Sequence, residues 1–240
     1  MTKKNILVFK HMPSQNPGIF RDFAESQNVN FIEIDLHAGD KIPDLKDFDG
    51  LWVMGGSMNV WEEDKYPWLI EEKLAIRYAV EDLKMPFLGI CLGHQLLAVA
   101  MGGKAIDTGR YEVGLFEIKP TEEGLNHPLL QNLKDSEKWV NAHLVEVIEA
   151  PENAIILATS EHCQNHVMQL GENAYSCQFH PEVCSHTLDG WMKIPGVPDF
   201  FDELSSNGID DLTSSITENL DVNNRASSVL FENWCNLVFN

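Results

Sequence analysis

The sequence is poor in basic residues and has none of the long apolar runs that cross membranes. Its 240 residues include 17 Lys and Arg against 37 Asp and Glu, which gives a formal net charge of −20. No stretch approaches the ~20 consecutive apolar residues that a membrane span needs, and the densest basic pair is Lys3-Lys4. A surface this negative repels phosphate backbones, so we expect neither a nucleic-acid partner nor a membrane.

Cysteine is sparse and lacks the spacing of a metal site. The five cysteines form no C-x-x-C pair, and their number is odd. The N-terminal apolar stretch is too short for a secretory signal, and no GxxxxGK[ST] loop is present to hold a nucleotide phosphate. The sequence therefore predicts a cytoplasmic protein with free thiols, no metal and no cofactor.

Strands and helices alternate along the first half of the chain. Apolar strands are expected at residues 5–9, 31–36, 51–54 and 86–91, with helices at 19–26, 68–83 and 94–101. This alternation predicts an α/β fold with an open, mostly parallel central sheet and helices on both faces.

The second half of the chain is richer in strands. We expect them at residues 113–119, 139–148, 154–159, 166–169 and 175–179 as a small antiparallel region, with a hairpin turn at 171–173. Residues 186–224 are polar and predict only short helices and loops, and 226–238 predict a final helix. The whole chain, residues 1–240, is interpreted as one domain with 186–240 as a helical and loop extension.

The strongest chemical signal is a cysteine at a junction between a strand and a helix. Cys91 ends an apolar strand and is flanked two residues away on each side by Gly89 and Gly93. Such a nucleophile elbow is sharp and crowded, so glycines leave room where a Cβ would collide. The helix N-terminus favours the thiolate form of the cysteine. We therefore predict that Cys91 is a catalytic nucleophile.

A cysteine nucleophile needs a base and a group that orients the base. His180 and Glu182 follow another apolar strand, with Pro181 between them. In extended backbone, residues two apart point the same way, and the proline favours extended backbone at His180. We predict that His180 exchanges the proton and that Glu182 holds its imidazole in place.

An oxyanion formed during acyl transfer needs backbone donors. Gly55 and Gly56 end the strand expected beside the elbow strand, and Leu92 follows the nucleophile. The N–H groups of Gly56 and Leu92 are our candidates for this oxyanion hole. Trp61 and Trp68 flank the next loop and are candidate walls of the pocket.

These motifs together resemble the class I glutamine amidotransferases. The two signatures are residues 86–95, which contain Gly-Ile-Cys-Leu-Gly-His-Gln, and residues 178–182, Gln-Phe-His-Pro-Glu; residues 55–57 resemble the oxyanion strand. The likeness continues at residues 112–115, 121–124, 127–130, 157–160 and 230–234. Among family members, the chain is most similar to stand-alone proteins that resemble the glutaminase part of GMP synthase.

The resemblance implies a flavodoxin-like fold and hydrolysis of the glutamine side-chain amide through a γ-glutamyl thioester. It also implies that Gln95 contacts the substrate, and Gly55 and Asn165 are further candidate substrate-binding residues. The chain departs from the family where relatives often have an aspartate and this sequence has Val145. The segment 160–166 is also irregular, so the identity of the substrate is left open.

Three functions remain in competition. The first is a glutaminase that releases ammonia to a separate synthetase partner or to solvent, since we expect no synthetase domain within these 240 residues. The second is a γ-glutamyl peptidase or hydrolase with the same triad, which an open pocket formed by residues 111–113 or 186–224 would favour. The third is a binding module without catalysis, which the complete triad makes the weakest of the three.

Overall fold

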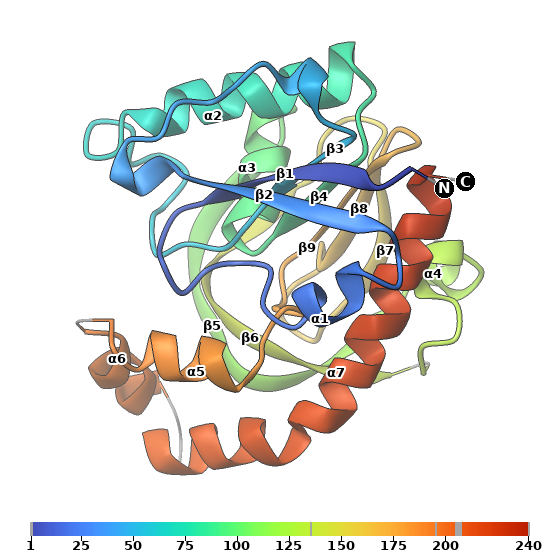
Figure 1. Cartoon of the computed structure of the whole chain (residues 1–240). Helices are drawn as coiled ribbons and strands as arrows, with labels where there is room; N and C mark the ends of the chain where they lie inside the picture. Colours follow the sequence, from blue (N-terminus) through green and yellow to red (C-terminus); the bar gives the residue numbers. More distant parts are fainter. Residues whose placement is uncertain (1, 135, 195, 205–207, 240) are drawn as a thin grey trace.

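One large mixed sheet organises the molecule (Figure 1). The computed structural model describes residues 2–134, 136–194, 196–204 and 208–239. Within them, nine strands lie in the order β2-β1-β3-β4-β9-β8-β7-β5-β6. The strands are β1 (Lys4–Lys10), β2 (Val29–Asp35), β3 (Gly50–Val53), β4 (Phe87–Ile90), β5 (Lys104–Pro120), β6 (Glu137–Glu149), β7 (Ile155–Thr159), β8 (Val167–Leu170) and β9 (Ala174–Cys177).

Helices cover both faces of this sheet. The α-helices are α1 (Phe20–Ala24), α2 (Trp68–Arg77), α3 (Leu92–Ala100), α4 (Glu122–Leu125), α5 (Ser185–Trp191), α6 (Val197–Leu204) and α7 (Ile209–Phe239). A π-helical turn, η3 (Tyr78–Asp82), extends α2, and short 3₁₀ turns are η1 (Leu36–Ala38), η2 (Leu45–Asp47) and η4 (Pro128–Leu130). Apolar residues of α2 and α3 share one buried cluster, and those of α1 and the second half of α7 share another.

The strands β2, β1, β3, β4 and β9 run parallel to one another. Every residue of β3, β4 and β9 is buried, as expected for strands covered on both faces. The predicted strands and helices of the first half are confirmed in this region. Because β3, β4 and β9 are parallel neighbours, their carboxyl ends meet at one edge of the sheet.

The remaining part of the sheet is antiparallel and larger than the sequence predicted. Four of the eight pairs of neighbouring strands are antiparallel, and they involve β9, β8, β7, β5 and β6. The sequence predicted a mostly parallel sheet with a small antiparallel region. This prediction is wrong about the share of antiparallel pairs, which is half of the neighbouring pairs. A short connection explains the antiparallel pairing of β8 with β9, since a tight turn joins only antiparallel neighbours. The predicted turn at 171–173 is this connection and is confirmed.

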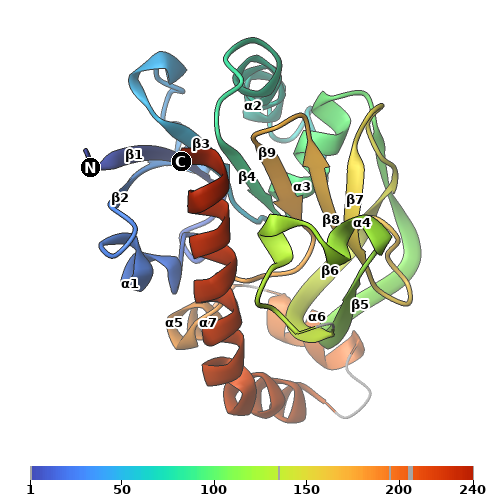
Figure 2. The same ribbon diagram turned by 90° about the vertical axis from the view of Figure 1, so that its right-hand side faces the viewer.

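The last quarter of the chain is more helical than expected. The helix predicted at residues 226–238 begins at Ile209, so α7 is 31 residues long. Its polar first half still buries Leu212, Ile216 and Leu220, a stripe with helical spacing. These residues pack with α5 and α6 against β5 and β6, and Figure 2 shows α6 and the first half of α7 below these two strands.

Within the described parts of the chain, no helix combines the length and the apolar character of a membrane span.

Candidate active site

Cys91 occupies the sharp corner between β4 and α3. Its backbone has φ 50° and ψ −102°, a positive-φ conformation that costs a non-glycine residue about 1–3 kcal/mol. A Cβ on Gly89 would lie 2.6 Å from the carbonyl oxygen of Gly93, and one on Gly93 would lie 2.0 Å from that of Val53. Both positions therefore require glycine, and the strained corner presents the Cys91 thiol at the carboxyl edge of the parallel strands.

His180 reaches the same edge from the segment that follows β9. Its backbone N–H donates to the Val140 carbonyl at 2.8 Å, and its Nδ1 lies 2.7 Å from Oε1 of Glu182. Both side chains are buried. The structure thus brings Cys91, His180 and Glu182 together from two neighbouring strands.

The surroundings of His180 favour its protonated form. Burial by itself lowers the pKa of the imidazole, but the charges of Glu182 and Cys91, together with hydrogen bonds to both, raise it to about 10. An imidazolium at neutral pH is the proton donor that a departing amine requires. The Nε2 of Gln178 also lies 3.6 Å from Cys91 Sγ.

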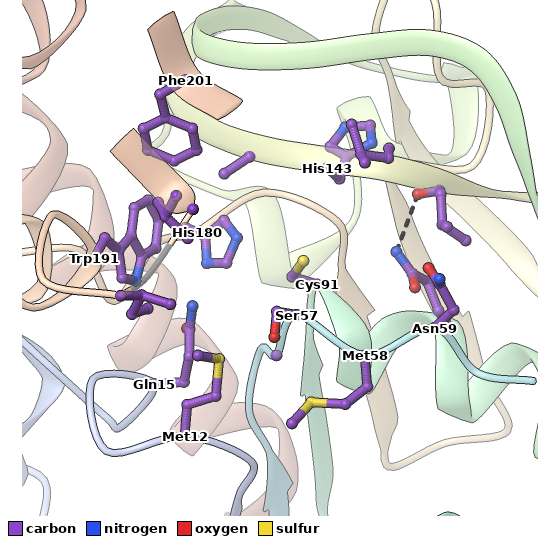
Figure 3. A pocket seen from close by; sticks show the side chains of 18 residues that line it. Met12, Gln15, Ser57, Met58, Asn59, Cys91, His143, His180, Trp191 and Phe201 are labelled. Carbon is purple, nitrogen blue, oxygen red and sulfur yellow. Dashed lines mark hydrogen bonds between the residues drawn. The ribbon is translucent and has the colours of Figure 1, made fainter. Parts of the chain in front are cut away.

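A cavity of about 410 Å³ opens over the thiol (Figure 3). Cys91, His180, Gly56 and Gln95 all line it. Volumes of this size, within about 300–1,000 Å³, are typical of small-molecule sites. The other lining residues are Met12, Gln15, Ser57, Met58, Asn59, Ala142, His143, Leu144, Val145, Trp191, Ile194, Gly196, Val197 and Phe201.

The predicted oxyanion residues lie beside Cys91, the predicted nucleophile. Gly56 follows β3 and lines the cavity, and Leu92 begins α3 directly after Cys91. A Cβ on Gly56 would come within 2.7 Å of Cδ2 of Leu92, so the two residues are in close contact. The Gly55 carbonyl accepts a hydrogen bond from Nδ1 of His11 at 2.9 Å.

The predicted substrate-binding residues have different positions. Gln95 lines the cavity, and its Nε2 donates to the Val145 carbonyl at 3.0 Å. Gly55 lies against His180, since a Cβ there would be 3.1 Å from the imidazole Cε1. Asn165 does not line the cavity and instead donates to the Val147 carbonyl at 2.7 Å.

Neither tryptophan proposed as a wall lines the cavity. Trp61 is half exposed, and Trp68 stacks on His11 at 5.4 Å between ring centroids. The wall is formed instead by Trp191, Ile194, Val197 and Phe201 from α5, α6 and their connection. The sequence analysis considered the segment 186–224 as a possible part of the pocket but singled out none of these four residues, because the segment is polar. The four-residue spacing of Val197 and Phe201 is the helical signal that could have identified them.

A second buried group of titratable side chains adjoins the cavity through His143, which is one of the lining residues. Nε2 of His143 and Nε2 of His166 lie 3.1 and 2.9 Å from Oε2 of Glu112, and Ser160 donates to the other carboxylate oxygen at 2.5 Å. Among the described residues, Glu112, His143 and His166 are the group with metal-ligand atoms within 4.8 Å of one another. Both imidazoles aim at one carboxylate oxygen, so hydrogen bonds already account for this arrangement.

Comparisons with known proteins agree with this geometry. The family model described as Glutamine amidotransferase class-I matches residues 14–192. The glutamine-hydrolysing GMP synthase subunit of Sulfolobus acidocaldarius is 37% identical over 62% of this chain and 74% of its own. A glutamine amidotransferase-like protein of Salmonella typhimurium is 30% identical over 76% of this chain and 77% of its own.

Solved structures show the same relationship. A glutamine amidotransferase from Thermotoga maritima has a TM-score of 0.84 and 26% identity, and the match covers 98% of this chain and 99% of the other. One from Methylobacillus flagellatus has a TM-score of 0.82, also at 26% identity, over 97% and 94% of the two chains. The resemblance found in the sequence is thereby confirmed. The chain belongs to the class I glutamine amidotransferase family, a family of glutaminase-type cysteine hydrolases.

Proposed function

We propose that this protein hydrolyses the side-chain amide of glutamine through a γ-glutamyl thioester on Cys91. The observation that carries the proposal is the convergence of a strained elbow cysteine and a histidine–glutamate pair in one cavity. A nucleophile, a base and a group that orients the base are the minimal set for acyl transfer of this kind.

Each residue has one role in the proposed reaction. The Cys91 thiolate attacks the carbonyl carbon of the amide, and the N–H groups of Gly56 and Leu92 stabilise the oxyanion. His180 gives its proton to the amide nitrogen, the C–N bond breaks and ammonia leaves. Water then attacks the thioester, His180 accepts its proton, and glutamate leaves as the Cys91 thiolate is restored.

Glu182 and Gln95 support these steps without exchanging protons. The 2.7 Å contact between Glu182 and Nδ1 of His180 fixes the tautomer whose Nε2 faces the reaction. Gln95, which lines the cavity, is proposed to contact the substrate, and so is Gly55, which lies beside the imidazole. Asn165 stays a weaker proposal, because its amide already donates to a backbone carbonyl.

We also propose a separate synthetase as the acceptor of ammonia. The support is the similarity to the S. acidocaldarius protein, whose name describes it as one component of a GMP synthase. We propose a single domain with a flavodoxin-like sheet core, to which residues 186–240 belong as an extension. The free thiols of all five cysteines support a cytoplasmic location.

One observation favours a second function, hydrolysis of other γ-glutamyl amides. The segment 186–224 contributes Trp191, Ile194, Val197 and Phe201 to the cavity. This is the arrangement that the sequence analysis associated with a γ-glutamyl peptidase or hydrolase. Residues 111–113, the other segment considered there, do not line the cavity.

The decisive experiment measures glutamate and ammonia released from glutamine by the purified protein. We expect turnover that Cys91→Ala abolishes and that the matched variant Cys184→Ala retains, because Cys184 lies outside the cavity lining. Mass spectrometry after incubation with a γ-glutamyl electrophile should find the adduct on Cys91. An adduct on another cysteine, or full activity of Cys91→Ala, would contradict the proposal.

A further inference from the structure

The cavity has a distinct side for the leaving group. In acyl transfer the leaving nitrogen takes its proton from the acid imidazole, so side chains that contact His180 flank the leaving group. The Trp191 ring meets His180 edge-on, with 4.9 Å between ring centroids. In Figure 3, Trp191 and Phe201 lie on the His180 side of the thiol, and His143 lies on the other.

This leaving-group side is apolar. Trp191, Ile194, Val197 and Phe201 line it, and the rings of Trp191 and Phe201 contact each other with centroids 6.2 Å apart. Among the described residues that line the whole cavity, none is Lys, Arg, Asp or Glu. Lys193 is exposed and is not part of the lining.

Ammonia gains nothing from such a wall, whereas an apolar substituent on the leaving nitrogen is removed from water by it. An amino-acid leaving group would carry a carboxylate, and apart from the His180 imidazolium, whose proton goes to the leaving nitrogen, this side offers no cation to pair with it. A buried charge without a partner is strongly unfavourable. The apolar wall therefore favours γ-glutamyl amides whose amine is apolar and uncharged over those whose amine carries a charge.

We propose that Trp191, Ile194, Val197 and Phe201 form a subsite for an apolar, uncharged amine, so that within the second function proposed above γ-glutamyl amides of such amines are preferred to glutamine. This inference rests on the proposed thioester mechanism. The Cys91 sulfur bonds to the γ-carbonyl carbon, the C–N bond breaks, and the amine leaves with the proton of His180. Water then releases glutamate, so one amide and one water give glutamate and a free amine.

Three substrates test the subsite. Glutamine, γ-glutamyl-phenethylamide and γ-glutamyl-phenylalanine share the acyl group, and the last two differ by one carboxylate. We expect kcat/KM for the phenethylamide to exceed that for each of the others by at least about tenfold, the scale on which apolar pockets discriminate. Equal or higher kcat/KM for glutamine or for γ-glutamyl-phenylalanine would overturn the inference.

A charge placed in the wall should reverse the preference. Ile194→Lys is expected to lower kcat/KM for the phenethylamide at least about tenfold and to raise it for γ-glutamyl-phenylalanine. Lys193→Gln, which changes one charge at the exposed neighbouring position outside the lining, should change neither by more than about twofold. An unchanged preference in Ile194→Lys, with folding verified by circular dichroism, would overturn the subsite but leave the mechanism intact. No cleavage of any substrate, together with no adduct on Cys91, would instead refute the proposed function and the subsite with it.

A separate observation concerns a histidine–glutamate pair behind the oxyanion strand. His11 and Glu72 are fully buried, and Nε2 of His11 lies 2.8 Å from Oε1 of Glu72. The other ring nitrogen, Nδ1, lies 2.9 Å from the carbonyl oxygen of Gly55. Glu72 is the buried acid of an otherwise amphipathic α2, and packing alone gives no reason for a carboxylate there.

The pair fixes the orientation of one peptide group. In a trans peptide the C=O of one residue and the N–H of the next point in opposite directions. Because the Gly55 carbonyl points to His11, the Gly56 N–H points away from His11, and Gly56 lines the cavity. Glycine at both positions allows the peptide to rotate easily, so an anchor is needed to hold it.

We infer that His11 and Glu72 are positioning residues that hold the Gly56 N–H toward the developing oxyanion. His11→Phe removes the donor to Gly55, and His11→Asn retains a donor in nearly the same place. We expect kcat to fall about tenfold to a hundredfold in His11→Phe, which is less than the ~10²- to 10³-fold loss on removing an oxyanion donor outright, because the Gly56 N–H is misplaced and not removed. KM should stay within about twofold, and kcat should recover partly in His11→Asn.

Two controls separate positioning from folding. Glu72→Gln should lower kcat, and Glu71→Gln on the exposed face of the same helix should not. Alkylation of Cys91 by iodoacetamide should keep its wild-type rate in all four variants, because the thiol itself is untouched. Equal losses in His11→Phe and His11→Asn, or a change confined to KM, would overturn this inference.

Discussion

Two groups of buried histidines and glutamates border the same cavity and differ in the balance between imidazoles and acidic groups. In the first, one imidazole, His180, lies between the Glu182 carboxylate and the Cys91 thiol. In the second, two imidazoles and a hydroxyl surround the single carboxylate of Glu112. Their residue types are nearly the same, so the number of acidic groups around each imidazole decides its charge.

The pKa values follow this difference. Although burial opposes it, the charges of Glu182 and Cys91 raise the pKa of His180 to about 10. For His166, burial is the largest influence and lowers its pKa, with the hydrogen bond to Glu112 only partly opposing it. The pKa of Glu112 is lowered despite its burial, because His143, His166 and Ser160 all hydrogen-bond to it. The first group thus holds a mobile proton near the thiol, and the second holds a fixed negative charge.

The largest expected effect is on activity and comes from the first group. Glu182→Gln should lower kcat/KM about 10²- to 10⁴-fold, because the amide neither stabilises the imidazolium nor fixes its tautomer. Steady-state kinetics with glutamine checks this. The matched substitution Glu112→Gln should reduce kcat/KM far less in the fraction that folds. Comparable losses of kcat/KM in Glu182→Gln and Glu112→Gln would contradict the prediction that only the first group acts on activity.

The second group is expected to act on stability. Glu112→Gln should lower the free energy of unfolding by about 3 kcal/mol, at the lower end of the range for breaking a buried pair by removing one partner. Chemical denaturation at pH 7 measures this. An unchanged denaturation midpoint would show that the three hydrogen bonds to the carboxylate contribute little.

The two groups should also respond oppositely to pH. His180 has a folded pKa raised above its ordinary value of 6.5, so its stabilisation is fully present below pH 6.5 and is lost as pH rises through about 10. Glu112 has a depressed pKa, so its stabilisation is present above its ordinary value of 4.5 and is lost as pH falls below it.

Unfolding curves across pH distinguish these losses in the wild type, Glu182→Gln and Glu112→Gln. The alkaline decline should be weaker in Glu182→Gln and the acid decline weaker in Glu112→Gln. Activity should likewise decline as pH rises through about 10, where His180 loses its proton. If stability depended on pH in the same way in Glu182→Gln and Glu112→Gln, the assignment of the alkaline decline to His180 and of the acid decline to Glu112 would be contradicted.

The smallest expected effect comes from one hydroxyl. Ser160→Ala removes a donor to Glu112 and an acceptor for the Cys163 N–H, and should lower the free energy of unfolding by about 1 kcal/mol. Ser136→Ala is the matched control, since Ser136 hydrogen-bonds to Glu117 at an exposed position and should change stability little. A larger loss of unfolding free energy in Ser136→Ala than in Ser160→Ala would contradict this prediction.

Local sequence patterns predicted the elbow and the strands beside it because those features are local. Gly89 and Gly93 are required by contacts within a few residues of Cys91 or with the adjacent β3. The antiparallel share of the sheet was underestimated, because the strand composition does not reveal which strands become neighbours. The early start of α7 at Ile209 was missed in a polar segment, although Leu212, Ile216 and Leu220 carry the helical spacing.

The cavity wall and the buried acids needed the complete fold. Glu72 and Glu112 look like ordinary surface acids in the sequence, and only long-range contacts place them against His11 and against His143 and His166. Trp61 and Trp68 were chosen as walls by their nearness in sequence to Gly56, whereas the wall comes from residues more than a hundred positions later.

The sequence by itself determined the family and the strained corner at Cys91, and it predicted the nucleophile and its acid–base partners, because each is encoded in a short motif whose backbone geometry is local. Only the tertiary structure decided what surrounds them, namely the apolar wall and the charge states of the buried histidines. These depend on which distant side chains share a space from which water is excluded, and in such a space a single neighbouring charge decides where a proton resides.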